Sequence, residues 1–343
     1  MSTLTLALLA CTEAEPVKPH FDAPDSAGSF DAVTYELDQT WQVWYPSLEG
    51  RGTEGAEYDD LLRGAAWSQG DVACEQTRPV IVFSHGHRGI RWQSVHLTEV
   101  LARHGYVVIA PDHENNTFLD GDGDATPTVA ARRPGEVRAS YERLFEEERF
   151  DGCIDPDAGY AVVGHSFGAF TALAVAGAGI DVEGLTAHCE DDPDDIMCGA
   201  EELLAEAEPI ADERVWASVP ITPGGATAFG DRVSELNVPI LVIAAGGDTT
   251  TPVDEDALPI YTGLTTETRY LAMFPDAGHF TFTDICMLLA DFNGCSEGYV
   301  DQAEAQDVGN TLVLALLAEA RGFDTQPWWT AEYGVAEVTA GSL

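Results

Sequence analysis

The chain has 343 residues, enough for one large domain or two ordinary ones, and its composition (45% hydrophobic, 22% charged) excludes a mainly disordered or fibrous protein. Asp and Glu total 59 against 16 Lys and Arg, which gives a formal net charge of −43. A surface this acidic repels the phosphate backbones of nucleic acids and also anionic lipid. We therefore expect no nucleic-acid partner.

Two explanations of the acidic charge remain open. Halophilic proteins accept self-repulsion between surface acids in exchange for solubility in salt, so the chain could come from a saline environment. The alternative is an ordinary acidic secreted protein. A melting temperature that does not rise between low and molar NaCl would contradict the saline hypothesis.

The N-terminus predicts an exported protein. The run Leu8-Leu9-Ala10-Cys11 ends an apolar stretch and resembles a bacterial lipoprotein box, although no basic residue precedes it. We therefore expect residues 1–11 to be a signal segment with lipidation at Cys11, and residues 12–30 to be a flexible acidic tether. This would place the protein in the periplasm, on the outer membrane or outside the cell. An ordinary exposed N-terminus is the alternative.

From residue 31 to residue 343 we expect one domain, because no second linker interrupts an alternation of strand and helix patterns. The predicted strands are 41–45, 80–84, 106–110, 160–164, 215–220, 240–244 and 270–274. The predicted helices are 92–104, 131–149, 167–178 and 303–321. Residues 80–83 and 240–243 are continuously apolar, which is typical of strands buried on both faces. The pattern predicts an α/β fold with a mostly parallel central sheet and helices on both faces.

Six cysteines remain if Cys11 is lipidated, and an even number suits an exported protein with disulfides. No CxxC or other zinc spacing occurs among them. The pairs that the spacing suggests are Cys74 with Cys153, Cys189 with Cys198, and Cys286 with Cys295.

The segment Gly164-His165-Ser166-Phe167-Gly168 has the pattern G-x-S-x-G, between a predicted strand and a helix of small residues. This is the context of a nucleophile elbow, in which a sharp turn exposes the serine hydroxyl. We therefore predict Ser166 as a nucleophile.

A serine nucleophile needs a base. In proteins with such a nucleophile elbow, the order along the chain is serine, acid, histidine. His279 follows the last predicted strand in a glycine-containing loop, whereas His188 lies in an acidic segment typical of solvated surface. Asp248 follows the predicted strand 240–244, which comes before the last one. It is our candidate for the acid that orients His279. The rival acids are Asp254, Asp256 and Asp276.

Two backbone N–H groups should bind the oxyanion. We assign one to Phe167, which follows the nucleophile, and the other to His87 in the His-Gly loop after strand 80–84. Metal binding by His85 and His87 is a weaker alternative, since no carboxylate or cysteine accompanies them at metal spacing, and we expect no metal.

The alternating aspartates of residues 120–124 suggest a calcium loop. Ala125 and Ala131, however, stand where such a loop requires Gly and Glu, so a solvated acidic turn is the preferred interpretation.

Taken together, these motifs resemble the α/β-hydrolase superfamily, and within it the bacterial group of predicted dienelactone hydrolases and platelet-activating-factor acetylhydrolases. The segments that carry the resemblance are 41–46, 82–86, 104–113, 133–137, 164–168 and 277–282. True dienelactone hydrolases use a cysteine nucleophile, so Ser166 argues against that substrate. Ala169, the residue after the G-x-S-x-G motif, stands where a glycine is frequent in this group.

The resemblance implies a serine carboxylic-ester hydrolase that uses Ser166, Asp248 and His279 and needs no cofactor. We expect a monomer acting on small-molecule or polymeric esters, neutral and of short to medium chain length. The alternatives are a phospholipase A2-like or platelet-activating-factor acetylhydrolase, a polyester hydrolase related in layout to cutinases, and a catalytically idle binding lipoprotein.

Overall fold

A computed structural model describes residues 31–37, 40–120, 126–207, 210–296 and 298–341 of the chain. Its centre is an 11-stranded sheet with the order β13-β12-β11-β10-β9-β7-β8-β2-β1-β6-β3. The strands of this sheet are β1 (Asp31–Leu37), β2 (Trp41–Ser47), β3 (Arg51–Glu54), β6 (Trp67–Gln69), β7 (Val80–Ser84), β8 (Val107–Pro111), β9 (Tyr160–His165), β10 (Val215–Ile221), β11 (Ile240–Ala245), β12 (Arg269–Phe274) and β13 (Glu337–Ala340). β4 (Glu57–Tyr58) and β5 (Leu62–Arg63) form a separate small hairpin.

The strands from β8 to β12 all pair in parallel, and antiparallel pairs of β2 with β8 and of β13 with β12 extend the sheet on either side. Parallel strands point their carboxyl ends to the same edge, where loops from distant parts of the chain meet. Ser166, Asp248 and His279 all follow strands of this central group.

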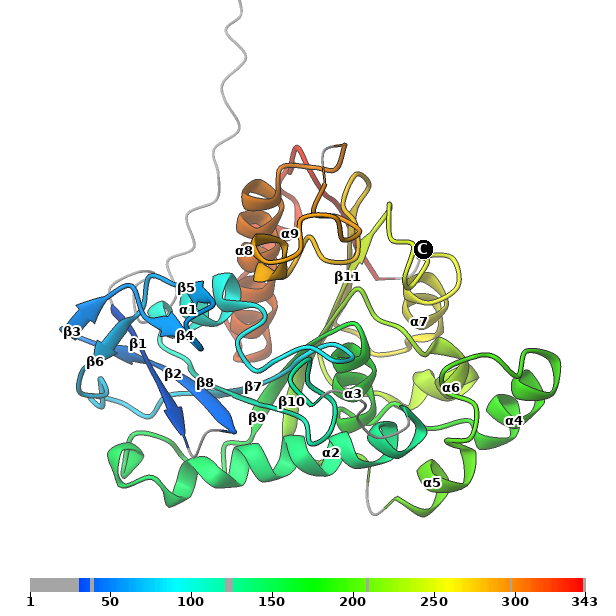
Figure 1. The fold of residues 1–343 in the computed structure, drawn as a ribbon, viewed down its shortest axis with the longest axis horizontal. Helices are drawn as coiled ribbons and strands as arrows, with labels where there is room; N and C mark the ends of the chain where they lie inside the picture. The colour runs from blue at the N-terminus through cyan, green and yellow to red at the C-terminus, as the bar shows by residue number, and fades with distance from the viewer. Residues whose placement is uncertain (1–30, 38–39, 121–125, 208–209, 297, 342–343) are drawn as a thin grey trace, which may run out of the picture.

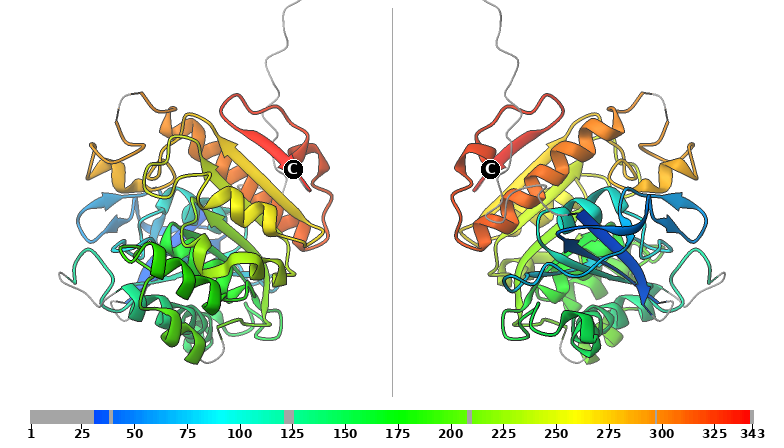
Figure 2. Two further views of the ribbon diagram at one scale, coloured as in Figure 1. Left: turned by 90° about the vertical axis from the view of Figure 1, so that its right-hand side faces the viewer. Right: turned by 90° about the vertical axis from the view of Figure 1, so that its left-hand side faces the viewer.

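Helices cover both faces of the sheet (Figures 1 and 2). On one face lie α1 (Val95–Arg103), α8 (Gln302–Ala320) and α9 (Gln326–Trp329). On the other lie α2 (Thr126–Arg143), α3 (Phe167–Val175), α4 (Val182–Asp191), α5 (Glu201–Glu206), α6 (Ala226–Phe229) and α7 (Ala257–Gly263). Short 3-10 turns are formed by Leu144–Glu146, Glu148–Phe150, Gly230–Glu235 and Asp284–Met287.

The apolar runs of the central strands supply two cores at once. In β7, Val80 and Val82 pack into the core under α2 and α3, whereas Ile81 and Phe83 pack into the core under α1 and α8. Successive strand side chains alternate between faces, so a strand covered on both sides must be apolar throughout. The predicted α/β fold, with a mostly parallel central sheet and helices on both faces, is confirmed.

Some boundaries differ from those predicted. The helix expected at 131–149 begins at Thr126 and ends at Arg143. Its first turn contains Pro127, whose missing N–H has no partner to lose there. The sequence analysis predicted neither β1, nor the short strands between residues 51 and 69, nor α4 to α7. Most of these elements are short or half-exposed, and β1 mixes apolar with polar residues, so they lack a clear periodic apolar signal.

Three disulfides are present, and their pairs are those suggested by the spacing: Cys74–Cys153, Cys189–Cys198 and Cys286–Cys295. Disulfides persist in oxidising compartments, which favours an exported protein.

The predicted lipidation site, Cys11, and the tether lie outside the described residues, as does most of the aspartate-rich segment 120–124. Within the described ranges, no helix combines the length and apolar character needed to cross a membrane.

Candidate active site

The nucleophile elbow lies between β9 and α3. Ser166 has φ 57° and ψ −119°, a strained conformation for a residue with a side chain, which turns the chain sharply from strand to helix. A Cβ on Gly164 would collide with the carbonyl oxygen of Gly168, and one on Gly168 would collide with that of Ser84. Both glycines of the predicted motif are therefore required by close backbone approaches.

The structure brings together the serine, histidine and acid chosen from the sequence. His279 Nε2 lies 2.9 Å from Ser166 Oγ, and His279 Nδ1 lies 2.7 Å from Asp248 Oδ2. These are hydrogen-bond distances, and they set the imidazole between a hydroxyl on one side and a carboxylate on the other. His279 is almost completely buried, while Ser166 remains 9% exposed.

The loop after β11 holds the Asp248 carboxylate in place. Its Oδ1 accepts the backbone N–H groups of Thr250 at 2.8 Å and Thr251 at 2.9 Å, and its Oδ2 accepts the Thr251 hydroxyl at 3.0 Å. Burial raises the pKa of Asp248, but its hydrogen bonds with His279 and these backbone donors outweigh burial and lower it overall. The carboxylate is thus held ionised and aimed at His279.

The rival residues occupy other places. Asp254 and Asp276 are exposed. Asp256 accepts the backbone N–H of Ala226 at 3.0 Å, and burial raises its pKa to about 6. His188, on α4, lies away from the elbow, and its Nε2 is 2.9 Å from Asp195 Oδ2.

The sequence analysis missed the role of Asn293, which joins the loops of the acid and the histidine. Its Oδ1 accepts the His279 backbone N–H at 2.6 Å, and its Nδ2 donates to the Gly247 carbonyl at 3.0 Å. Asn293 lies inside the loop closed by Cys286–Cys295, so a short disulfide loop just after the histidine was the available signal.

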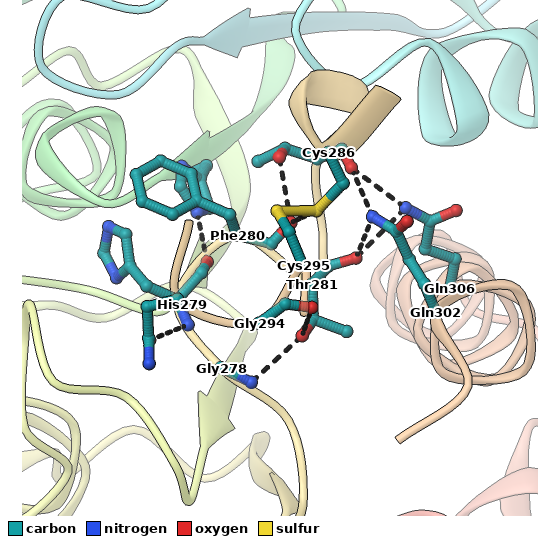
Figure 3. Close-up of a disulfide and its surroundings, with 12 residues drawn as sticks. Gly278, His279, Phe280, Thr281, Cys286, Gly294, Cys295, Gln302 and Gln306 are labelled. Carbon is teal, nitrogen blue, oxygen red and sulfur yellow. Dashed lines mark hydrogen bonds between the residues drawn. A yellow bond between two sulfur atoms is a disulfide. The ribbon is translucent and has the colours of Figure 1, made fainter. Parts of the chain in front are cut away.

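The segment between His279 and the disulfide loop is fixed to α8. Figure 3 shows the Cys286–Cys295 bond beside the segment from His279 to Thr281, with Gln302 and Gln306 on its other side. The two glutamines donate to the Thr281 carbonyl at 3.2 Å and 3.0 Å. The loop that carries His279 is therefore restrained on two sides.

His165 holds the backbone of His279 in place. Its Nε2 lies 2.8 Å from the His279 carbonyl oxygen, and burial together with the nearby His279 lowers the pKa of His165 to about 3. His165 therefore stays neutral and donates Nε2–H to that carbonyl. Its Nδ1 has no partner in the part of the chain that the structure describes.

The two residues predicted to supply the oxyanion donors, His87 and Phe167, are in side-chain contact. The rings of His87 and Phe167 make an edge contact with centroids 5.8 Å apart. Among the described residues, neither backbone N–H donates to a protein acceptor, whereas the Gly86 N–H is taken by Gln93 Oε1 at 3.1 Å. Both N–H groups are thus free to bind a ligand oxygen within the described part of the chain, and their role as an oxyanion hole remains a prediction.

A second hydrogen-bonded series of serine, histidine and carboxylate lies at the end of β7, just before the His-Gly loop. His113 Nε2 lies 2.8 Å from Ser84 Oγ, and His113 Nδ1 lies 2.6 Å from Glu136 Oε2. Ser84 and His113 are both fully buried, so no ester can reach this hydroxyl. This series braces the end of β7, which carries the His-Gly loop.

The described residues contain no group of three His, Cys, Asp or Glu side chains arranged to hold a metal ion. His85 Nε2 instead accepts the His113 backbone N–H at 3.1 Å, and the His87 ring lies 3.1 Å from the Asn116 amide.

Comparisons with known proteins bear on the fold. Residues 60–120 match a family model described as platelet-activating factor acetylhydrolase, isoform II. A solved ferulic acid esterase from Streptomyces cinnamoneus is similar with a TM-score of 0.63 at 21% identity, covering 93% of this chain and 98% of that chain. The chain has the α/β-hydrolase fold. No curated protein matches.

The α/β-hydrolase fold explains why the three residues meet. Ser166 follows β9, Asp248 follows β11 and His279 follows β12, so all three loops leave the carboxyl edge of one parallel sheet. The order serine, acid, histidine along the chain is the one typical of this fold.

Proposed function

We propose that the protein is a serine carboxylic-ester hydrolase that works through an acyl-enzyme on neutral esters of short to medium chain length. The observation that carries the proposal is the continuous hydrogen-bonded chain from Ser166 Oγ through His279 to Asp248. The similarity to an esterase structure and the partial match to the acetylhydrolase model are consistent with ester hydrolysis.

In the proposed mechanism, Ser166 Oγ attacks the ester carbonyl while His279 Nε2 takes its proton. The backbone N–H groups of Phe167 and His87 stabilise the oxyanion of the tetrahedral intermediate. His279 then gives the proton to the leaving alcohol. Water, deprotonated by His279, hydrolyses the acyl-enzyme and regenerates Ser166.

The surroundings of the site favour apolar, uncharged esters. The Phe280 ring lies 4.8 Å from the His279 ring and 4.9 Å from that of Phe292, between ring centroids. Phe292 belongs to the Cys286–Cys295 loop, which also exposes Met287, with 69% of its surface accessible, and Leu289. Apolar side chains beside the site, in a chain with a net charge of −43, disfavour anionic substrates.

The proposal predicts that the protein hydrolyses p-nitrophenyl butyrate and that Ser166→Ala lowers kcat at least about 10⁴-fold, since the variant lacks the nucleophile. His188→Ala is the matched control and should keep wild-type kcat, because His188 lies away from the elbow. Wild-type turnover by folded Ser166→Ala would contradict the proposal. Methyl ferulate, an acetylated zwitterionic phospholipid and a polyester film, tested beside the butyrate, would separate the substrate classes.

A further inference from the structure

Arg133 of α2 is fully buried and packs against the segments that carry the two predicted oxyanion donors. Its guanidinium donates from NH1 to the His85 carbonyl at 2.6 Å and from NH2 to the Gly86 carbonyl at 2.9 Å. The guanidinium carbon also lies 4.8 Å from the centre of the Phe167 ring. One side chain thus contacts both the His-Gly loop and the residue that follows the nucleophile.

The charge of Arg133 has no direct counterion among the residues that the structure describes. Within the described residues no carboxylate forms an ion pair with it. Its guanidinium instead contacts two main-chain carbonyls, the Asn116 side-chain oxygen and, at 3.4 Å, His85 Nδ1. The nearest acid on its own helix, Glu136, is already bound to His113 and Arg132. Burial lowers the pKa of Arg133 to about 9, which reflects the cost of keeping a cation here.

The contact with Gly86 bears on the oxyanion hole through the geometry of the peptide bond. The Gly86 carbonyl and the His87 N–H belong to one planar trans peptide unit, so they point in opposite directions. A donor that holds the carbonyl oxygen therefore fixes the direction of the N–H. Hydrogen bonds in series also polarise one another, so a cation on the carbonyl strengthens the N–H as a donor.

Further contacts complete the restraint. His85 Nδ1 lies 2.7 Å from the same Gly86 oxygen, and the Asn116 amide, bound to Arg133 through its oxygen, reaches His87 Nδ1 with its nitrogen at 3.1 Å. The peptide that ends in the His87 N–H is thus held at its carbonyl and at the following side chain.

We propose that Arg133 is a positioning residue for the oxyanion hole, which orients and polarises the His87 N–H by binding the Gly86 carbonyl and adds a fixed positive charge near the site. The proposal rests on the esterase function proposed above. An oxyanion exists only in the intermediate and its flanking transition states, so Arg133 should affect kcat and leave KM almost unchanged.

The test compares Arg133→Gln, which removes the charge, with Arg133→Lys, which keeps the charge but cannot hold both carbonyls. Each kcat is measured on p-nitrophenyl butyrate and divided by the fraction of active sites titrated with a fluorophosphonate, so that misfolded molecules do not count. Loss of a whole oxyanion donor costs roughly 10²–10³ in rate, so we expect a fall of about 10–100-fold for Arg133→Gln and a smaller fall for Arg133→Lys. Arg138→Gln, on the same helix, is the control with the same change of charge.

A second readout separates positioning from a general structural role. A boronic acid inhibitor binds Ser166 Oγ as a tetrahedral adduct with an oxygen in the oxyanion hole, so its Ki should rise in the Arg133 variants by about the same factor as kcat falls. A per-site kcat within about twofold of wild type, an unchanged Ki, or a rise in KM alone would overturn the proposal. If Arg133→Gln does not fold, the same criteria apply to Arg133→Lys. A folded wild type without esterase activity would instead refute the proposed function.

Discussion

Asp248→Asn is expected to lower kcat on p-nitrophenyl butyrate about 10⁴-fold without unfolding the protein. The reason lies in the contacts of the two carboxylate oxygens. Oδ1 accepts two backbone N–H groups, from Thr250 and Thr251, so an asparagine must keep its oxygen there. Its NH2 group then replaces Oδ2 and faces His279 Nδ1, 2.7 Å away in the native structure.

An amide donor at that point requires Nδ1 to be the unprotonated nitrogen, so the proton moves to Nε2. An imidazole protonated on Nε2 cannot accept the proton of Ser166, and the first step is blocked although every atom stays in place. Asp256→Asn makes the same isosteric change on a neighbouring acid that does not contact His279. It should keep kcat within about threefold, and an equal loss in both variants would contradict the role assigned to Asp248.

Removing the Cys74–Cys153 disulfide is expected to have the largest effect on stability. It closes a loop with a sequence separation of 79, whereas each of the other two disulfides spans 9. A cross-link stabilises by restricting the unfolded chain, and the effect grows with loop length. We expect the Cys74→Ser/Cys153→Ser variant to lose about 4 kcal/mol of unfolding free energy, against about 2.5 kcal/mol for the Cys189–Cys198 pair.

Denaturant unfolding under non-oxidising, non-reducing conditions would measure both losses, and a greater loss for the short loop would contradict the chain-entropy explanation. The Cys286–Cys295 pair should behave differently from both, because its loop carries Asn293, which bonds the His279 and Gly247 backbones. Its removal is expected to lower kcat several-fold in folded protein, whereas removal of Cys74–Cys153 should leave the kcat of folded molecules unchanged.

The sequence was informative where one local signal decides the structure. The strands β7, β9 and β11 were predicted within one residue of their observed bounds, since a strand covered on both faces must be apolar throughout. The elbow was recognisable because its two glycines are required by close backbone contacts. The order of elements along the chain then pointed to Asp248 and His279.

The rest depends on contacts between distant segments. Arg133 is 47 positions from the Gly86 carbonyl that it binds, and Asn293 is 46 from that of Gly247. No periodicity or spacing encodes such contacts. An arginine within a helix pattern is usually a solvated charge, and its burial here becomes visible only when α2 packs against the sheet.

The most direct test of the account is covalent labelling of Ser166. A fluorophosphonate probe reacts when an activated serine Oγ attacks phosphorus and fluoride leaves, so it reports the nucleophile itself, independent of the natural substrate. We predict one adduct per folded molecule, mapped by peptide mass spectrometry to the peptide that contains Ser166 and absent from Ser166→Ala. Folded wild-type protein that takes up no label, or equal labelling of Ser166→Ala, would contradict the assignment of Ser166, His279 and Asp248 as a catalytic triad.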